Sequence, residues 1–206
     1  MNPDRNGNKS KRPKISNGVK VLGIAGSPRI GGNSEVLLDS ALAGAESAGA
    51  KTEKIVLSKL KITPCDSDSA CRKNGRCYIK DDMQLIYKKL AAADAIIISS
   101  PVYFGSVTAQ LKAMIDRCQV FWVENFIFKK KPSKKQKGLF LCVSSHDNKS
   151  YFKNSHLIID LLFKVMRVKF IGSVYAANLE LKGDILLRKA LLKKTFNKGK
   201  QLIINR

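Results

Sequence analysis

The segment GSPRIGGNS, residues 26–34, gathers side chains suited to holding a phosphate. It joins an apolar run to a stretch with helical spacing, so it connects a buried strand to the start of a helix. At such a junction, free backbone N–H groups and the positive end of the helix dipole attract anions. The spacing matches neither a P-loop nor a Gly-x-Gly-x-x-Gly dinucleotide turn. The residues that favour a phosphate site over a tight turn capped by a serine are Ser27, Arg29, Gly31, Gly32, Asn33 and Ser34.

A second segment, SSPVYFGS at residues 99–106, places two aromatic side chains at the end of another apolar run. Tyr103 and Phe104 stand beside Pro101 and Gly105, where a strand would leave the core. Exposed aromatic rings are costly unless they cover something flat, so a planar ring system is a candidate ligand. The alternative is that both rings pack against a neighbouring helix or another subunit.

Cysteines form the third group of reactive side chains. The chain has five, an odd number in a sequence without an export signal, which argues for reduced thiols or metal ligands rather than a disulfide framework. Cys65, Cys71 and Cys77 lie close together in the segment PCDSDSACRKNGRCYIKDDM, so they are the candidate metal ligands.

Apolar patterning predicts the elements that position these segments. One helix should run from Asn33 or Ser34, as its cap, to about residue 48, and Asp81 and Asp184 should cap two later helices. The expected strands are residues 19–26, 50–60, 95–100, 137–145 and 169–177. The other expected helices are residues 80–94, 108–122, 155–166 and 183–201.

Alternation of strands and helices, with nearly continuous apolar strands, predicts an α/β fold. We expect a flavodoxin-like, doubly wound sheet of five parallel strands with helices on both faces. In such sheets a ligand binds beyond the carboxyl ends of the strands where the winding reverses. The loops expected there are residues 26–34, 99–107 and 144–152.

The formal net charge of +22 is the most unusual bulk property. Residues 1–20 carry six basic side chains and one acidic one, so most of the charge lies elsewhere, most densely at residues 129–138 and 186–201. Neither segment interleaves aromatic residues or has zinc-finger spacing, which favours a solvated lysine-rich surface that attracts anionic substrates over nucleic-acid binding.

The chain is long enough for one substantial core and short for two. We expect residues 1–18 to form a basic, disordered arm and residues 19–206 to form one domain. No apolar run is long enough to cross a bilayer, and the N-terminal segment lacks the apolar centre of a signal peptide. The expectation is a cytoplasmic protein without membrane insertion.

Taken together, GIAGSPRIGGNSEVLL, PVYFGSVTAQLKAMIDR and the cysteine segment resemble the NADPH-dependent FMN reductase family, and especially its iron-sulfur flavoprotein branch. The resemblance covers nearly all of the chain after residue 18. It implies that the FMN phosphate binds at Ser27, Arg29, Gly32, Asn33 and Ser34. It also implies that the isoalloxazine lies along Pro101, Val102, Tyr103, Phe104 and Gly105, with its pyrimidine end near Ser144, Ser145 and His146.

In the iron-sulfur branch four cysteines precede the second helix, and the matching positions here are Cys65, Asp68, Cys71 and Cys77. Clusters are normally held by four thiolates, so the aspartate argues against a cluster. We interpret the segment first as a loop whose cysteines bind no metal. An altered cluster is the second interpretation and a zinc site the third.

The resulting hypothesis is an FMN-containing oxidoreductase that takes electrons from NAD(P)H and passes them to a quinone, a flavin or a ferredoxin-like protein. One alternative is an electron carrier reduced by an acidic ferredoxin, and another is a nucleic-acid-binding module on the same scaffold. The resemblance further implies a homodimer or tetramer, in which Phe121, Trp122 and Phe126 are candidates for burial between subunits.

Overall fold

The computed structural model describes residues 18–204. Among them, five parallel strands form one sheet in the order β2-β1-β3-β4-β5, which confirms the predicted doubly wound fold. The strands are β1 (Lys20–Ala25), β2 (Lys51–Val56), β3 (Ala95–Pro101), β4 (Gln136–Val143) and β5 (Val168–Ala176). The predicted arm, residues 1–18, lies outside the described residues except for Gly18.

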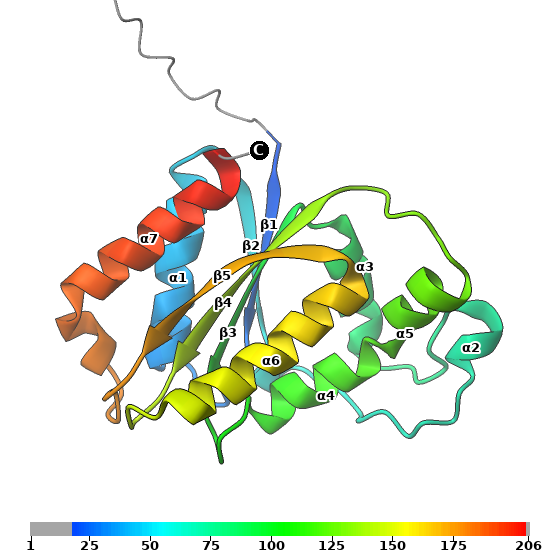
Figure 1. The fold of residues 1–206 in the computed structure, drawn as a ribbon, viewed down its shortest axis with the longest axis horizontal. Coiled ribbons are helices and arrows are strands. Elements are labelled where there is room, and N and C mark those ends of the chain that lie inside the picture. The colour runs from blue at the N-terminus through cyan, green and yellow to red at the C-terminus, as the bar shows by residue number, and fades with distance from the viewer. Residues whose placement is uncertain (1–17, 205–206) are drawn as a thin grey trace, which may run out of the picture.

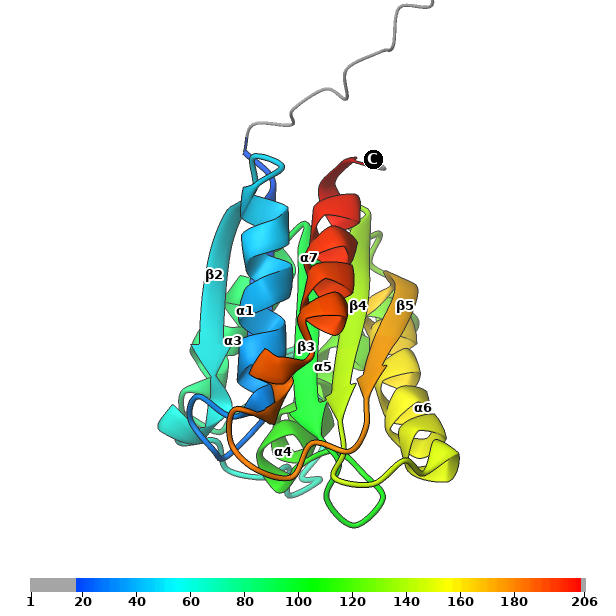
Figure 2. The ribbon, with the colours of Figure 1, turned by 90° about the vertical axis from the view of Figure 1, so that its left-hand side faces the viewer.

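Helices cover both faces of this sheet (Figures 1 and 2). Helices α1 (Asn33–Glu46) and α7 (Lys189–Ile204) lie on one face, and α3 (Met83–Ala92), α4 (Ala109–Arg117) and α6 (Lys149–Met166) lie on the other. The shorter helical segments are η1 (Leu57–Lys59), α2 (Cys71–Asn74), α5 (Gln119–Trp122), the π-helical turn η2 (Val123–Ile127) and η3 (Asp184–Leu187). No helix within residues 18–204 is long and apolar enough to span a bilayer.

The two faces of the sheet bury different side chains because successive residues of a strand point to opposite sides. Leu22, Ile24 and Ile96 pack beneath α3, α4 and α6, whereas Val21 and Ile97 pack beneath α1 and α7. Central strand β3 is buried along nearly its whole length, which is why its sequence is apolar without alternation.

Two predicted caps, Asn33 or Ser34 and Asp184, are wrong, and the third, Asp81, lies one residue before the cap position of its helix. Helix α1 follows Gly32, which makes no side-chain cap, and the Asn33 side chain bonds to another loop instead. The Asp81 carboxylate accepts from Met83 N at 3.1 Å, but Asp82 precedes α3 and Asp81 chiefly binds Arg117. Asp184 does not cap α7, because it begins the separate turn η3. Its carboxylate accepts from the N–H groups of residues 180 and 181.

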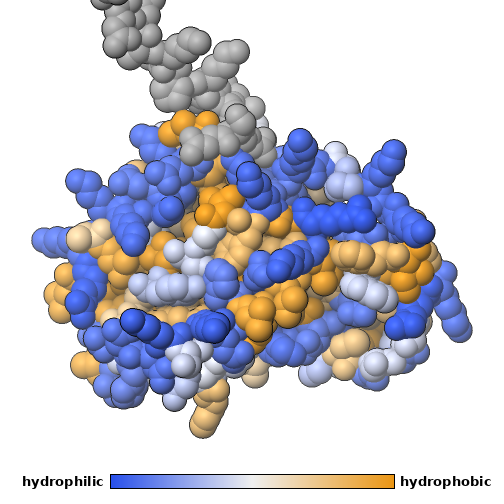
Figure 3. All heavy atoms as spheres, viewed as in Figure 1, coloured by the Kyte–Doolittle hydropathy of each residue, from blue (hydrophilic) through white to orange (hydrophobic). Residues whose placement is uncertain are grey.

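Hydrophobic side chains remain exposed on the face that carries α6 and β5. In Figure 3 they form a band bordered by hydrophilic residues. Leu157 and Leu161 of α6 and Tyr175 of β5 are exposed there. Phe126 is also exposed and stacks on Trp122, whereas Phe121 packs edge-on against Tyr87.

Candidate functional site

The three predicted loops meet at one cavity of about 240 Å³ at the carboxyl edge of the sheet, as the doubly wound topology requires. Residues at the ends of β3 and β4, at the start of α1 and in the loops after β1, β3, β4 and β5 line it. They are Ser27, Arg29, Gly32, Asn33, Ser34, Pro101, Val102, Tyr103, Val143, Ser144, Ser145, Leu179 and Glu180.

The first loop presents donors to this cavity from the N-terminus of α1. The backbone N–H groups of Asn33 and Ser34 have no hydrogen-bond acceptor within residues 18–204, and neither does the buried Ser34 hydroxyl. Ser27 is occupied differently, because its Oγ accepts from Arg29 N at 3.0 Å and lies 3.3 Å from Arg29 O. The loop therefore offers an anion two free N–H groups and a hydroxyl at the positive end of a helix dipole.

Gly26 lets this loop approach β3 closely. Its N–H donates to Ser99 O at 2.8 Å, and a Cβ at this position would meet the same oxygen at 2.9 Å and Leu111 Cβ at 3.0 Å. The Thr108 hydroxyl, which also caps α4 by accepting from Leu111 N, donates to Gly26 O. These contacts fix where β1 ends and thus where the donors of the first loop lie.

Asn33 lines the cavity, but its amide already has partners. The Asn33 Nδ2 donates to Leu181 O at 2.8 Å, while its Oδ1 accepts from Gly183 N at 3.0 Å and Ile185 N at 3.3 Å. Arg29 Nη1 lies 3.4 Å from Glu180 O in the same segment. Both side chains hold the loop after β5 against the first loop, so Asn33 positions a wall of the cavity.

The second loop folds into a tight hairpin. Backbone bonds in both directions join Tyr103 and Ser106 at 2.9 and 3.0 Å, and Phe104 and Gly105 between them have φ values of 49° and 72°. This geometry exposes the Phe104 ring fully at the tip. Tyr103 lines the cavity, whereas Phe104 and Gly105 do not.

The third loop contributes two serines. Ser144 N donates to Ala176 O at 2.8 Å and its Oγ accepts from His146 N at 3.2 Å, while Ser145 N has no acceptor within the described part of the chain. The ring of His146 lies 2.9 Å from Ser145 Oγ and does not line the cavity. The free Ser145 N–H is thus the main-chain donor that this loop can offer a ligand.

Leu179 and Glu180 were missed in the sequence, although they line the cavity. Leu179 N donates to Ser144 O at 3.2 Å, which brings the segment after β5 onto the third loop. The sequence could have indicated these two residues only through the fold, because the segment that contains them follows the carboxyl end of β5.

A family model described as NADPH-dependent FMN reductase matches residues 19–179, the span that contains every wall of this cavity except Glu180. The chain belongs to this family. The predicted cofactor, FMN, is therefore confirmed for the family.

Curated relatives include iron-sulfur flavoproteins of two archaea. The one from Methanosarcina thermophila is 43% identical over 113 residues, which are 55% of this chain and 59% of the relative. The one from Methanocaldococcus jannaschii is 46% identical over 99 residues, 48% of this chain and 51% of the relative. The matched region thus spans little more than half the length of these relatives.

Solved structures support the same fold. A flavone reductase superposes with a TM-score of 0.69 at 20% identity, covering 90% of this chain and 62% of its own. An NAD(P)H:quinone oxidoreductase from Methanothermobacter marburgensis gives 0.67 at 18% identity, covering 90% and 96%. At these identities the likeness shows the fold.

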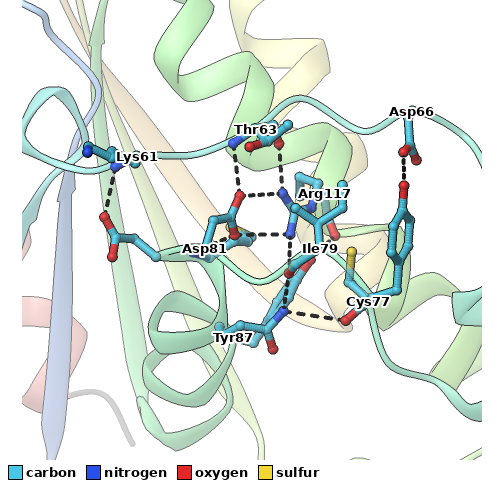
Figure 4. Close-up of polar contacts among 12 residues, drawn as sticks. Lys61, Thr63, Asp66, Cys77, Ile79, Asp81, Tyr87 and Arg117 are labelled. Atoms are coloured by element: carbon cyan, nitrogen blue, oxygen red, sulfur yellow. Dashed lines mark hydrogen bonds and ion pairs between the residues drawn. The ribbon is translucent and has the colours of Figure 1, made fainter.

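The cysteine segment is fastened by a buried ion pair at its base (Figure 4). Arg117 of α4 is 1% exposed and binds both carboxylate oxygens of Asp81, at 2.7 and 3.2 Å. Its Nη1 also donates to Thr63 O at 2.7 Å, and Asp81 accepts from Thr63 N at 2.8 Å. This ion pair and these hydrogen bonds thus join the two ends of the segment. A hydrogen bond from Tyr78 to Asp66 adds a contact within it.

The donor set of this segment does not fit the cluster named in the archaeal relatives. A carboxylate stands at the second of four ligand positions, and no three His, Cys, Asp or Glu side chains of the described residues are arranged to hold a metal ion. Burial raises the pKa of the Cys71 thiol, and the neighbouring Cys77 and Cys65 add to this. The metal-free thiol is therefore protonated at neutral pH, and binding a metal ion would release its proton.

We expect anaerobically purified protein to contain iron well below one atom per chain and to show flavin absorption without a broad cluster shoulder. Iron and acid-labile sulfide assays on the purified protein check this. About four irons and four sulfides per chain would contradict it and would make Asp68 or an outside group the fourth ligand.

Proposed function

We propose that the cavity binds FMN and that the chain is an NAD(P)H-dependent oxidoreductase. The observation that carries the proposal is that one cavity combines unpaired donors at the start of α1 with an aromatic side chain and a free N–H across from them. The donors suit a phosphate, and the Tyr103 and Ser145 side suits a flat, polar ring.

Each wall has a distinct role in this proposal. The phosphate would be held by four groups: the N–H groups of Asn33 and Ser34, the Ser34 hydroxyl and the Arg29 guanidinium. Pro101, Val102 and Tyr103 would cover the ring, and the Ser145 N–H would donate to its polar edge. FMN held there would supply the redox chemistry, hydride acceptance from a reduced nicotinamide and electron transfer to a second substrate. The chain itself binds, orients and keeps water from part of the ring.

The charge of +22 favours a second candidate, an electron carrier reduced by an acidic protein such as a ferredoxin. Anaerobic mixing separates the two candidates. Oxidation of NADPH or NADH with a quinone or free flavin supports the oxidoreductase, whereas fast reduction by a ferredoxin without such turnover supports the carrier.

We also propose that the protein is a homo-oligomer. Phe126, Leu157 and Leu161 have exposed apolar side chains in the part of the chain that the structure describes. Another copy of the chain would cover them. Phe121 and Trp122 are already partly covered by other residues of the same chain. Phe126 is therefore the strongest of the three residues that the sequence suggested for burial between subunits.

We expect Ser34→Ala to weaken FMN binding about 10- to 100-fold, because a lost hydrogen bond to a charged group costs roughly 1.5–3 kcal/mol. Riboflavin, which has the same ring without the phosphate, should keep its affinity. Ser34 is a cleaner probe than Ser27, because the Ser27 hydroxyl also shapes the turn.

Titration of apoprotein with FMN and with riboflavin measures both affinities. Ser47→Ala, at the other end of α1, is the matched control and should change neither. Tyr103→Ala should weaken both ligands through the shared ring. An unchanged FMN-to-riboflavin affinity ratio in Ser34→Ala would place the phosphate elsewhere.

A further inference from the structure

A carboxylate lies directly behind the proposed phosphate site. Glu35 occupies the first turn of α1 and is only 7% exposed. Its Oε2 accepts from Gly31 N at 2.8 Å. An acidic side chain at this place would repel an anionic ligand unless its charge is offset.

The Gly31 contact explains what the carboxylate does. Gly31 has a φ of 66°, in the left-handed region, and the adjoining turn is closed by Gly32 N donating to Arg29 O at 3.2 Å. Glu35 thus reaches back as the glutamate of a capping box does, but to the residue before the N-cap. Holding Gly31 fixes the turn that presents Arg29 on one side and the free N–H groups of residues 33 and 34 on the other.

Lys54 of β2 offsets the charge. Its Nζ lies 2.8 Å from Glu35 Oε1 and 2.8 Å from Asp39 Oδ1, so one cation serves two carboxylates of α1. Burial acts to raise the pKa of Glu35, but hydrogen bonds from Lys54 and Gly31 outweigh it and leave that pKa lowered. Glu35 is therefore an anion at neutral pH. Lys54 does not line the cavity.

We propose that Glu35 is a positioning residue for the phosphate and that Lys54 makes this carboxylate compatible with an anionic ligand. Preorganisation of the turn favours binding, while the charge opposes it, and Lys54 shifts the balance toward binding. The inference rests on the proposed function, because it requires the phosphate to lie at the start of α1.

The test is the ratio of FMN to riboflavin affinity in apoprotein variants. Glu35→Ala removes the turn contact, and we expect about tenfold weaker FMN binding with riboflavin unchanged. Glu35→Gln keeps an acceptor for Gly31 N and removes the charge, so FMN affinity should stay equal or rise. Lys54→Met leaves the carboxylate unscreened, and FMN binding should weaken about fivefold at low salt and less at high salt.

Asp39→Asn is the matched control, because it removes a second carboxylate from the same helix and the same lysine without touching Gly31. It should leave the ratio unchanged or slightly raised. Equal losses in Asp39→Asn and Glu35→Ala, or no loss in Glu35→Ala, would overturn the positioning role.

Wild-type protein separates this failure from a failure of the proposed function. If the wild type prefers FMN strongly and Ser34→Ala lowers that preference, the phosphate site stands whatever the Glu35 variants do. If the wild type binds FMN and riboflavin equally, both the phosphate site and the role of Glu35 are wrong. Thermal melts of each apoprotein show whether Glu35→Ala is folded; should it not be, Glu35→Gln and Lys54→Met decide the question.

Discussion

Replacing Gly199 with alanine is expected to destabilise the protein by about 3 kcal/mol, the upper part of the range for an overpacked core. Helices α1 and α7 pack with their backbones close together, and a Cβ at Gly199 would lie 1.8 Å from Ala41 O. A Cβ at Gly44 would lie 1.9 Å from Phe196 O. Both obstacles are backbone atoms, so only separation of the helices relieves the clash.

The sign of the effect is informative because helix propensity alone predicts the opposite. In a helix interior, alanine is better than glycine by about 0.8–1 kcal/mol. Thermal melts should show a loss of about 6–12 °C for Gly199→Ala, from the usual 2–4 °C per kcal/mol at this size. Lys200→Ala, exposed on the next position of α7, is the control and should change little. A more stable Gly199→Ala would show that α7 does not pack on α1 at this distance.

The strand order and both helix layers were predictable from the sequence because they depend on patterns that many residues share. Strand β3 is apolar on both sides, and α1 repeats apolar residues at helical spacing. The meeting of the three loops at one cavity was predictable for the same reason, since topology alone brings the carboxyl ends of β1, β3 and β4 together.

Individual side-chain partners were not predictable, because they depend on how close two distant loops come. The side chain of Asn33 is of a type that can bind phosphate, yet its amide forms hydrogen bonds with residues 181–185. The sequence around Asn33 does not indicate that these distant residues lie beside it. Phe104 was expected on the ring, but the hairpin at residues 103–106 turns it to solvent. In the sequence, Glu35 is an ordinary acidic residue in the first turn of a helix. Its contacts with Gly31 and Lys54 are known only from the structure.

The second large effect concerns Arg117, whose replacement by methionine should cost about 3–5 kcal/mol at pH 7, because it leaves a buried carboxylate without its cation. Asp81 is the partner, with a side chain only 8% exposed. Lys112→Met on the same helix removes an exposed ion pair with Asp116 and should stay within about 0.5 kcal/mol. Urea unfolding of the three proteins gives the comparison. A loss in Arg117→Met no larger than in Lys112→Met would mean that the pair does not fasten the cysteine segment.

The pH dependence of stability shows whether the Asp81 carboxylate causes the loss of stability in Arg117→Met. In the wild type, burial acts to raise the pKa of Asp81, but the hydrogen bond from Arg117 and that from Thr63 N outweigh it and leave the pKa lowered. The pair's contribution is therefore complete above the unfolded pKa of about 3.9 and is lost as the pH falls through the lower folded value. Without Arg117, burial should raise the Asp81 pKa instead, so the variant's deficit should shrink between pH 7 and about pH 4 as the carboxyl takes up a proton. A deficit that stays constant over that interval would assign the loss to packing of the arginine stem, because packing does not titrate.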